Sequence, residues 1–195
     1  MGAYSDGSTK VSPELIAEHI AVSLDRFQVE TIDLYVLHRD DPKVPVGELV
    51  GCLNEHVAAG RIRAFGGSNW THRRIEEANA HAAARGLRGL VASSPNLALA
   101  VPLEPMWKDC VSIAGDAEAL EWYRRTQLPV LAWSSQARGF FSGRFSPEVC
   151  PDPDVGRVYY SADNWERLRR VQEMAVRHDT SPSRVVLAWV LHQPL

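Results

Sequence analysis

Apolar positions along the chain follow two alternating patterns. Short unbroken apolar runs, typical of strands buried in a parallel sheet, alternate with segments whose apolar residues lie three and four positions apart, as on one face of a helix. The unbroken runs recur about every thirty residues and cover 32–37, 63–69, 90–95 and 129–135. This order predicts repeated β–α units, which build either a doubly wound sheet or a closed (βα)8 barrel.

Capping residues mark the starts of the helices between these runs. Serine before proline is expected to cap helices at Ser12 and Ser181, Asp116 is expected to cap another, and Asp163 to open a capping box. The predicted helices span 13–27, 46–62, 71–86, 117–127, 163–178 and 182–192. The first is expected to pack on the sheet through Ile16, Ile20, Leu24 and Phe27.

Two long connections interrupt the later units. The segment 97–116 is rich in proline and tryptophan, and the segment 142–162 is rich in proline and aspartate. Connections of this length without a helical pattern are uncommon in compact folds. We therefore expect the second one to be a mobile lid or an excursion from the sheet.

The composition is that of an ordinary globular protein and excludes several functional classes. Of the 195 residues 45% are hydrophobic, and a net charge of −3 gives no basic surface for nucleic acid or for an anionic membrane. The longest apolar run, 185–191, is too short to span a bilayer, and no secretion signal is recognisable. The three cysteines lack metal-ligand spacing, so we expect reduced thiols, no metal site and a cytoplasmic location.

Residues able to do chemistry gather just after the predicted strands. Parallel α/β folds build their sites at the carboxyl ends of strands, and His38 follows the first strand. A histidine there can act on a substrate or serve as a hydrogen-bonded strand-end residue, and position alone favours the second role. Asp40 and Asp41 are adjacent, so turn formation before Pro42 is their expected role. No P-loop, nucleophile-elbow, zinc-protease or Rossmann glycine motif is present.

Three segments in series resemble the aldo-keto reductase family. They are IDLYVLHR at 32–39, AGRIRAFGGSN at 59–69 and AWSSQARG at 132–139, in the order and with the spacing of the family. The resemblance covers nearly the whole chain from about Ser12, and it implies a (βα)8 barrel that binds a nicotinamide dinucleotide without a Rossmann glycine motif. It also implies reduction of an aldehyde or ketone, with NADP(H) as the expected cofactor and NAD(H) as the alternative.

The same resemblance implies roles for individual residues. His38 becomes the catalytic histidine that donates a hydrogen bond to the substrate carbonyl, and Ser68 and Asn69 become the pair that binds the nicotinamide carboxamide. Trp133 takes the place of an aromatic residue, usually tyrosine, that stacks on the nicotinamide; the competing role is a core tryptophan. The other implied cofactor contacts are Ser94, where the family usually has glutamine, and, near the pyrophosphate, Ser134, Gln136, Arg138, Gly139 and Arg144.

The resemblance places further family residues outside the matched segments. The family's Asp, Tyr and Lys belong before Ser12, where the residues 1–4 resemble the turn after the Lys, and the adenosine-binding segment belongs after Leu195. We therefore expect a single incomplete domain over 1–195, of class α/β: a partial (βα)8 TIM barrel of about four βα units, strands 4 to 7 of the family barrel, with flanking helices.

Two consequences of this expectation concern partners. Unpaired strand edges are expected to associate with other chains, because parallel sheets leave open hydrogen-bonding groups at their edges. A small-molecule carbonyl compound is the expected substrate. The alternative function, of a different class, is a catalytically incomplete remnant that at most binds a nucleotide or a partner.

Overall fold

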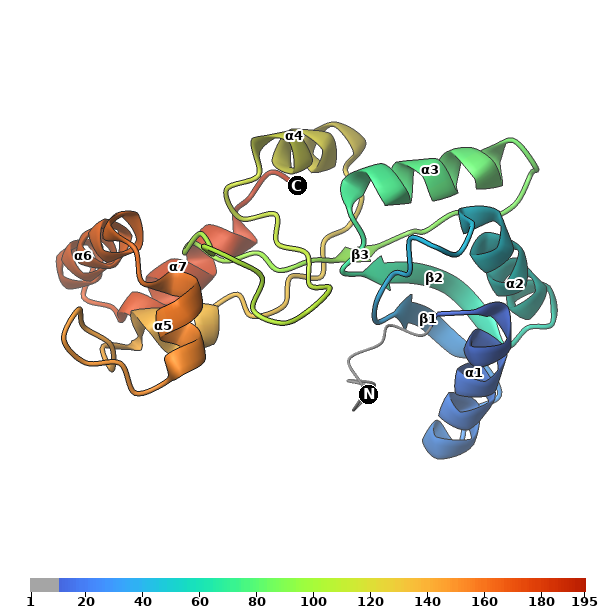
Figure 1. The fold of residues 1–195 in the computed structure, drawn as a ribbon, viewed down its shortest axis with the longest axis horizontal. Coiled ribbons are helices and arrows are strands. Elements are labelled where there is room, and N and C mark those ends of the chain that lie inside the picture. Colours follow the sequence, from blue (N-terminus) through green and yellow to red (C-terminus); the bar gives the residue numbers. More distant parts are fainter. Residues whose placement is uncertain (1–10) are drawn as a thin grey trace. The chain divides into compact units, whose positions relative to one another are not determined.

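A sheet of three parallel strands in the order β1-β2-β3 organises the first half of the chain in the computed structural model, which describes residues 11–195 (Figure 1). The strands are β1 (Ile32–Leu37), β2 (Ile62–Ser68) and β3 (Ser93–Ser94). Leu37 pairs with Gly67, and Ser68 pairs with Ser94. The carboxyl ends of the three strands therefore meet at one edge of the sheet.

Within the described residues β1 is an edge strand. It pairs with β2 alone, and its residues Asp33 and Leu34 are exposed whereas Leu37 is buried. The prediction that this strand is covered on both faces is therefore wrong. A strand with a single neighbour leaves one row of backbone groups unpaired and offers fewer neighbours to its side chains.

The two later strands are shorter than the sequence predicts. The third keeps two residues, and the fourth forms only isolated parallel bridges at Val130 and Trp133. Pro95 follows the third strand and Pro129 begins the fourth, and proline has no N–H group to donate to a ladder. Regular pairing consequently stops after a few hydrogen bonds.

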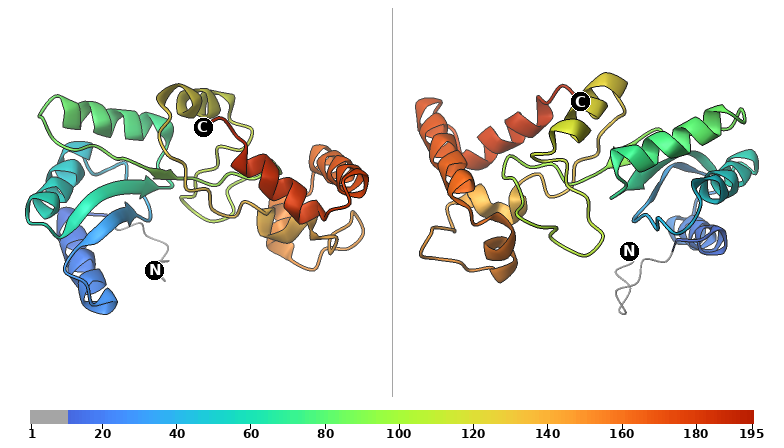
Figure 2. Two further views of the ribbon diagram at one scale, coloured as in Figure 1. Left: turned by 180° about the vertical axis from the view of Figure 1, so that it is seen from behind. Right: turned by 45° about the horizontal axis from the view of Figure 1, so that its top comes forward.

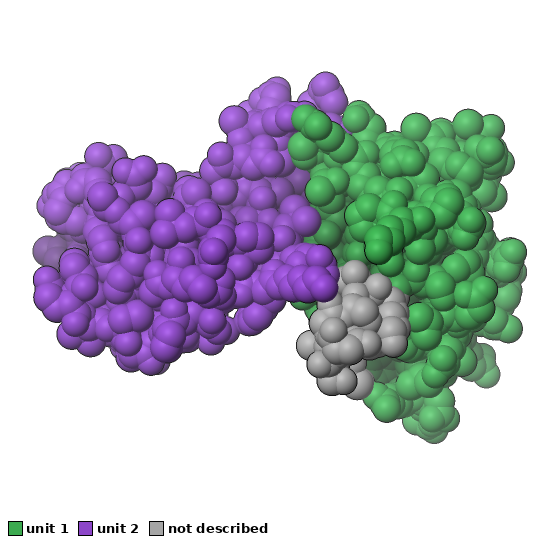
Figure 3. Space-filling view, in the orientation of Figure 1, with its two compact units in different colours: residues 1–94, 128–131 green, residues 95–127, 132–195 purple. Residues whose placement is uncertain are grey.

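The described residues divide into two compact units, which are coloured separately in Figure 3. Unit 1 comprises the chain up to 94 together with 128–131, and unit 2 comprises 95–127 and 132–195. The prediction of one incomplete barrel domain over 1–195 stays a prediction. The turn expected at 1–4 lies outside the described residues.

Unit 1 contains three helices next to the sheet (Figure 1 and Figure 2). They are α1 (Pro13–Phe27), α2 (Val46–Ala58) and α3 (His72–Ala83). The helix α2 packs against α1, α3 and β2. As predicted, Ser12 caps α1, and its hydroxyl accepts a hydrogen bond from the Leu15 N–H at 3.3 Å.

Two details of these helices differ from the prediction. Helix α2 ends before Ile62, because Gly60 adopts φ of 73° and Ile62 already belongs to β2. Phe27 was expected to pack on the sheet with Ile16 and Ile20, but it is 69% exposed while those two are buried. Phe27 is the last residue of α1, where the apolar face of the helix extends beyond the part of the helix that is buried.

Unit 2 is helical around an aromatic core. Its helices are α4 (Ala117–Thr126), the 3-10 segment η1 (Ala137–Ser142), α5 (Pro153–Tyr159), α6 (Ala162–Arg177) and α7 (Pro182–Leu191). Phe140 and Phe141 are fully buried and meet edge to face, with ring centroids 5.3 Å apart. The core around them includes Tyr159, Leu168 and Val186. Asp116 and Ser181 cap α4 and α7 as predicted.

The segment 142–162 was expected to be a mobile lid or an excursion; a mobile lid is wrong for the part that packs in the core, and an excursion from the sheet stays a prediction. The segment contains α5, whose residues Val155 and Val158 are fully buried in the core of unit 2. The following helix is capped by Ser161 rather than by the predicted Asp163. The Ser161 hydroxyl accepts from the Asn164 N–H at 3.2 Å, so the helix begins two residues earlier than the capping-box pattern suggests. The buried Asn164 side chain bonds the backbone of Val101.

Two further expectations concern reduced cysteines and the lack of a segment that could span a bilayer. All three cysteines, of which Cys52 is buried, are free thiols. Among residues 11–195 no helix combines the length and the apolar character needed to cross a bilayer.

Candidate functional site

A hydrogen-bond network at the strand ends of unit 1 joins four residues that the sequence singles out. The Asn69 side-chain amide donates to the His38 carbonyl oxygen at 3.1 Å and to the Ser68 hydroxyl at 3.0 Å. The Ser68 hydroxyl donates to the Ser94 carbonyl oxygen at 2.8 Å, and the Asn69 backbone N–H reaches the same oxygen at 3.1 Å. The residues His38, Ser68, Asn69 and Ser94 are thus held together at one edge of the sheet.

The backbone of Asn69 explains how its side chain reaches this network. Asn69 is the first residue after β2 and has φ of 60°, in the left-handed region where asparagine is tolerated better than most residues. This turn ends the strand and lets the amide point back toward His38. Asn69 is buried, so its polar groups depend on these protein partners.

The loop after β1 contains an ion pair that sequence reasoning missed. Asp40 was assigned to the turn, yet its carboxylate is buried and accepts from the Arg74 guanidinium at 3.0 Å. Asp41 does form the turn, since its carboxylate accepts from the Lys43 N–H at 3.0 Å. Burial raises the pKa of Asp40, and Arg74 acts in the opposite direction.

The loop of unit 2 that begins at Trp133 has an unusual backbone. Ser134, Arg138 and Gly139 have φ of 50°, 53° and 86°, so three of the residues predicted to wrap a pyrophosphate adopt left-handed conformations. Gln136 precedes η1, and Arg144 follows it. Successive turns of this kind form anion-binding sites in other proteins. In this structure the N–H groups of Ala137 and Gly139 donate within the loop, to the Ser134 and Gln136 carbonyl oxygens at 2.9 and 2.8 Å.

Gly139 makes room for a guanidinium group. A Cβ at this position would lie 2.9 Å from Nη2 of Arg144, and the Arg144 Nε donates to the Ser142 hydroxyl at 3.2 Å. Arg144 is exposed apart from these contacts and its position over the Phe145 ring. The glycine therefore brings a positive charge close to the backbone of the loop.

Two predicted cofactor residues contact groups within unit 2. The Arg138 guanidinium pairs with Asp152 at 2.8 Å and lies 5.6 Å from the ring centre of Trp107. Hydrogen bonding from Arg138 lowers the pKa of Asp152. Trp107 in turn stacks on Trp133, with ring centroids 5.9 Å apart and planes inclined by 29°. Trp133 is therefore neither a free platform nor a fully buried core residue.

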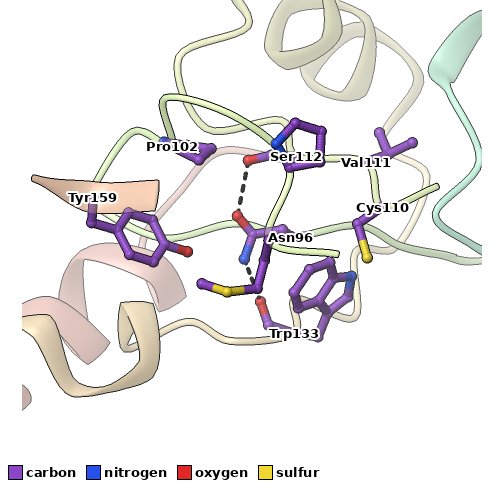
Figure 4. A pocket seen from close by; sticks show the side chains of 9 residues that line it. Asn96, Pro102, Cys110, Val111, Ser112, Trp133 and Tyr159 are labelled. Carbon is purple, nitrogen blue, oxygen red and sulfur yellow. Dashed lines mark hydrogen bonds between the residues drawn. The ribbon is translucent and has the colours of Figure 1, made fainter. Parts of the chain in front are cut away.

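A small cavity of about 10 Å³, with room for about one water molecule, lies beside Trp133 in unit 2, and Figure 4 shows Asn96, Tyr159 and Trp133 around it. The Asn96 amide donates to the Trp133 carbonyl oxygen at 3.1 Å and accepts from the Ser112 hydroxyl at 2.9 Å. The indole N–H of Trp133 is buried and has no hydrogen-bond partner among the described residues. Burial raises the pKa of Tyr159 to about 12, so its hydroxyl stays protonated.

The ten predicted site residues thus fall into two groups. His38, Ser68, Asn69 and Ser94 are joined within unit 1, and the others belong to the loop 133–144 of unit 2. Sequence reasoning missed Trp70, Arg74, Trp107 and Asp152. Only Asp152 carried a usable signal, since a capping residue before a proline marks a helix start, as Ser12 does before Pro13.

Parallel β–α units with polar groups at the carboxyl ends of the strands define an α/β protein, and its candidate site lies at the ends where such folds build their sites. Residues 3–195 match the aldo/keto reductase family, and the chain belongs to this family. It is 30% identical over 188 residues to aldo-keto reductase str7 of Strobilurus tenacellus, with 93% of this chain and 52% of the relative covered. It is 27% identical over 188 residues to an aldo-keto reductase of Schizosaccharomyces pombe named yakc with the label NADP(+), again with 93% of this chain and 51% of the relative covered.

The fold agrees with this membership. A solved structure of the thermostable aldo-keto reductase Tm1743 with the inhibitor epalrestat superposes with a TM-score of 0.67 at 21% identity, covering 94% of this chain and 54% of that chain. The chain therefore has a TIM-barrel-like α/β fold. It spans about half the length of the relatives it matches.

Proposed function

We propose that this chain supplies part of the active site and of the cofactor site of an oxidoreductase that reduces an aldehyde or ketone to an alcohol with NAD(P)H. One observation carries the proposal. The Asn69 side chain joins His38 and Ser68 by hydrogen bonds at the carboxyl ends of β1 and β2. These bonds hold the backbone of His38 and the Ser68 hydroxyl together at the edge of the sheet where parallel α/β folds build their sites.

The finer architecture is part of the same proposal. The strands β1, β2 and β3 and the bridged segment 129–135 would be strands 4 to 7 of a (βα)8 barrel. Their spacing along the chain and their common direction support this assignment. In such a barrel the carboxyl ends of the strands form the face on which catalysis occurs.

His38 is the proposed catalytic residue. The nicotinamide, when bound, supplies the hydride that reduces the carbonyl group. An imidazole N–H of His38 donates a hydrogen bond to the oxygen of the carbonyl substrate, which orients the substrate and stabilises negative charge that develops on that oxygen. His38 is exposed, and the hydrogen bond from Asn69 fixes its backbone.

Ser68 and Asn69 are the proposed contacts of the nicotinamide carboxamide. Both side chains are buried, and the donors of the Ser68 hydroxyl and the Asn69 amide are committed to Ser94, His38 and Ser68, so the pair would contact the carboxamide as acceptors. The Ser94 hydroxyl donates to the Leu131 carbonyl oxygen at 2.8 Å. Its hydrogen is thereby committed to the sheet, and Ser94 would contact the carboxamide as an acceptor or through water.

The loop 133–144 fits the anionic part of a dinucleotide. The cradle of Gly139 and Arg144 supports this fit, because it combines a close approach of backbone with a positive charge. Ser134, Gln136 and Arg138 would complete the pyrophosphate site, and Trp133 would stack on the nicotinamide ring. NADP(H) is the proposed cofactor, supported by the NADP(+) in the name of the Schizosaccharomyces pombe relative, with NAD(H) as the alternative.

A second candidate function is binding of a nucleotide or partner without catalysis. The observation that favours it is the use of Trp133 and Arg138 in internal contacts with Trp107 and Asp152. The contact with Asp152 would have to change before Arg138 could meet a cofactor, and Trp107 already covers one face of the Trp133 ring.

Titration of the purified chain with NADPH, followed by cofactor fluorescence, tests both candidates. We expect saturable binding that is weakened in Arg144→Ala and retained in Arg124→Ala, a matched control on α4. Absence of saturable binding would contradict the reductase and the nucleotide-binding form of the second candidate. Reading the gene upstream of Met1 then separates them: an in-frame Asp, Tyr and Lys series supports the reductase, and its absence supports the remnant.

A further inference from the structure

The backbone of the loop after β1 is held by side chains from one short segment, 69–74. The Asn69 amide donates to the His38 carbonyl oxygen at 3.1 Å, and the Trp70 indole N–H donates to the Arg39 carbonyl oxygen at 3.2 Å. The Arg74 guanidinium donates to the Asp41 carbonyl oxygen at 3.3 Å and also to the Val44 carbonyl oxygen. Four carbonyl groups of the loop are thus bonded by three side chains.

Burial makes these contacts matter. Trp70 is 1% exposed, Asp40 is 9% exposed, and the Arg74 side chain is 12% exposed. The Arg74 guanidinium carbon lies 5.6 Å from the ring centre of Trp70, and its Nε donates to the Asp40 carboxylate at 3.0 Å. A buried guanidinium that lost its acceptors would leave a charge without compensation, so this arrangement is strongly favoured over alternatives.

The guanidinium of Arg74 can bond several acceptors of the loop at once, which a lysine ammonium group cannot do with the same geometry. Arg74 bonds the Asp40 carboxylate through Nε and two loop carbonyls through Nη2. A planar fork with five N–H donors can reach several acceptors at fixed angles, whereas an ammonium group is a single point charge on a flexible stem.

We propose that Trp70 and Arg74 are positioning residues for His38. They hold the loop backbone through Arg39, Asp41 and Val44, and so fix the direction in which the loop presents the histidine. This inference rests on the proposed function only for the role of His38. The hydrogen bonds of Trp70 and Arg74 to the loop backbone, here called the clamp, are a property of unit 1. Neither residue touches a substrate or a cofactor in this assignment.

The contrasting role for Arg74 is general stabilisation of α3 and the sheet. A positioning role predicts changes confined to the loop and to the His38 ring. A general stabilising role predicts changes spread over unit 1, including amides remote from Trp70 and Arg74 such as Ile32 at the start of β1, which donates to the Arg61 carbonyl oxygen at 2.9 Å.

Heteronuclear NMR of the full chain, with amide hydrogen exchange, separates these roles. Arg74→Lys keeps the charge, and Trp70→Phe keeps most of the core volume while removing the N–H group. Arg73→Lys is the matched control, an exposed arginine next to Arg74 on α3. The amides of Lys43 and Val44 report on the loop, because both are hydrogen-bonded to Asp41.

In Arg74→Lys we expect shifted or broadened His38 ring signals and about tenfold faster exchange at Lys43 and Val44. Trp70→Phe should act in the same direction, and Arg73→Lys should leave both readouts unchanged. Unaltered His38 signals, or equal acceleration at Ile32, would overturn the proposal. A chain that fails to bind NADPH but shows these loop effects would contradict the proposed function and leave the clamp intact.

Discussion

Trp107 lies against the ring of Trp133, the residue that family resemblance assigns to the nicotinamide. The ring centroids are 5.9 Å apart, and the planes are inclined by 29°. One face of Trp133 is thus covered by a residue from the connection 97–116. Trp107 itself is 45% exposed, so moving its ring away from Trp133 would expose less buried area than moving a core tryptophan.

The first prediction concerns Trp133. If its ring stacks on the nicotinamide, Trp133→Ala should weaken NADPH binding about tenfold, because aromatic contacts contribute about 0.5–1.5 kcal/mol beyond their buried area. Trp133→Tyr should bind nearly as well as the parent. Fluorescence titration measures both, and equal affinity of Trp133→Ala and the parent would mean that Trp133 serves only to pack against Trp107.

The second prediction concerns the pair of Arg138 and Asp152. Asp152→Asn keeps an oxygen to cap α5 but removes the charge that pairs with Arg138. A partly exposed ion pair contributes at most about 1 kcal/mol, so release of Arg138 should strengthen NADPH binding up to about fivefold. Glu148→Gln, an equal change of charge on an exposed residue nearby, is the control. Weaker binding in Asp152→Asn would show that Asp152 orients Arg138 for the cofactor.

The third prediction concerns pH and His56. Burial, and next the nearby Arg61, lower the pKa of His56 in the folded chain. The unfolded chain therefore binds this proton more readily, and the contribution to stability is complete above the ordinary histidine pKa of about 6.5 and is lost as pH falls below it. Urea unfolding should show this decline in the parent and a smaller one in His56→Gln. The exposed His19→Gln should retain the parental decline; equal slopes in all three would contradict the assignment.

The fourth prediction concerns association through β1. This strand has one described neighbour, and Leu34 is 37% exposed upon it. Open strand edges pair with other chains, and lysine on an edge opposes such pairing. Sedimentation should therefore show association that grows with concentration and is reduced severalfold in Leu34→Lys. A parent chain that stays monomeric at micromolar concentration would contradict the prediction.

Local chemistry explains why some elements were predictable. Ser12, Asp116 and Ser181 cap the helices that they were expected to cap, because a cap depends on a few neighbouring residues. The Asp152-Pro153 signal has the same form, yet the surrounding Pro- and Asp-rich sequence hid the short helix α5. The predicted lengths of the third and fourth strands were wrong because Pro95 and Pro129 interrupt the hydrogen-bond ladder. An apolar run predicts burial but not strand pairing.

Only those residues of the candidate site that lie in recognisable sequence motifs could be predicted. Ser68 and Asn69 belong to a recognisable segment, and the structure joins them to His38. The contacts of Arg74 with Asp40 and of Trp107 with Trp133 link segments far apart in the chain. Periodicity contains no information about such partners, because an arginine on a helix looks the same whether it faces solvent or a buried carboxylate.

Gly66 and Gly67 set a limit on how variation in this part of β2 can be interpreted. A Cβ at Gly66 would lie 2.6 Å from the Ala92 carbonyl oxygen, and one at Gly67 would lie 2.8 Å from the Trp70 ring. Any side chain there would force apart the backbone and the indole that the strand packs against. In a saturation-mutagenesis library both positions should tolerate almost no substitution for steric reasons alone. Intolerance at these glycines, two residues from Ser68 and Asn69, would therefore say nothing about chemistry, and evidence for catalysis must come from positions where a substitution fits.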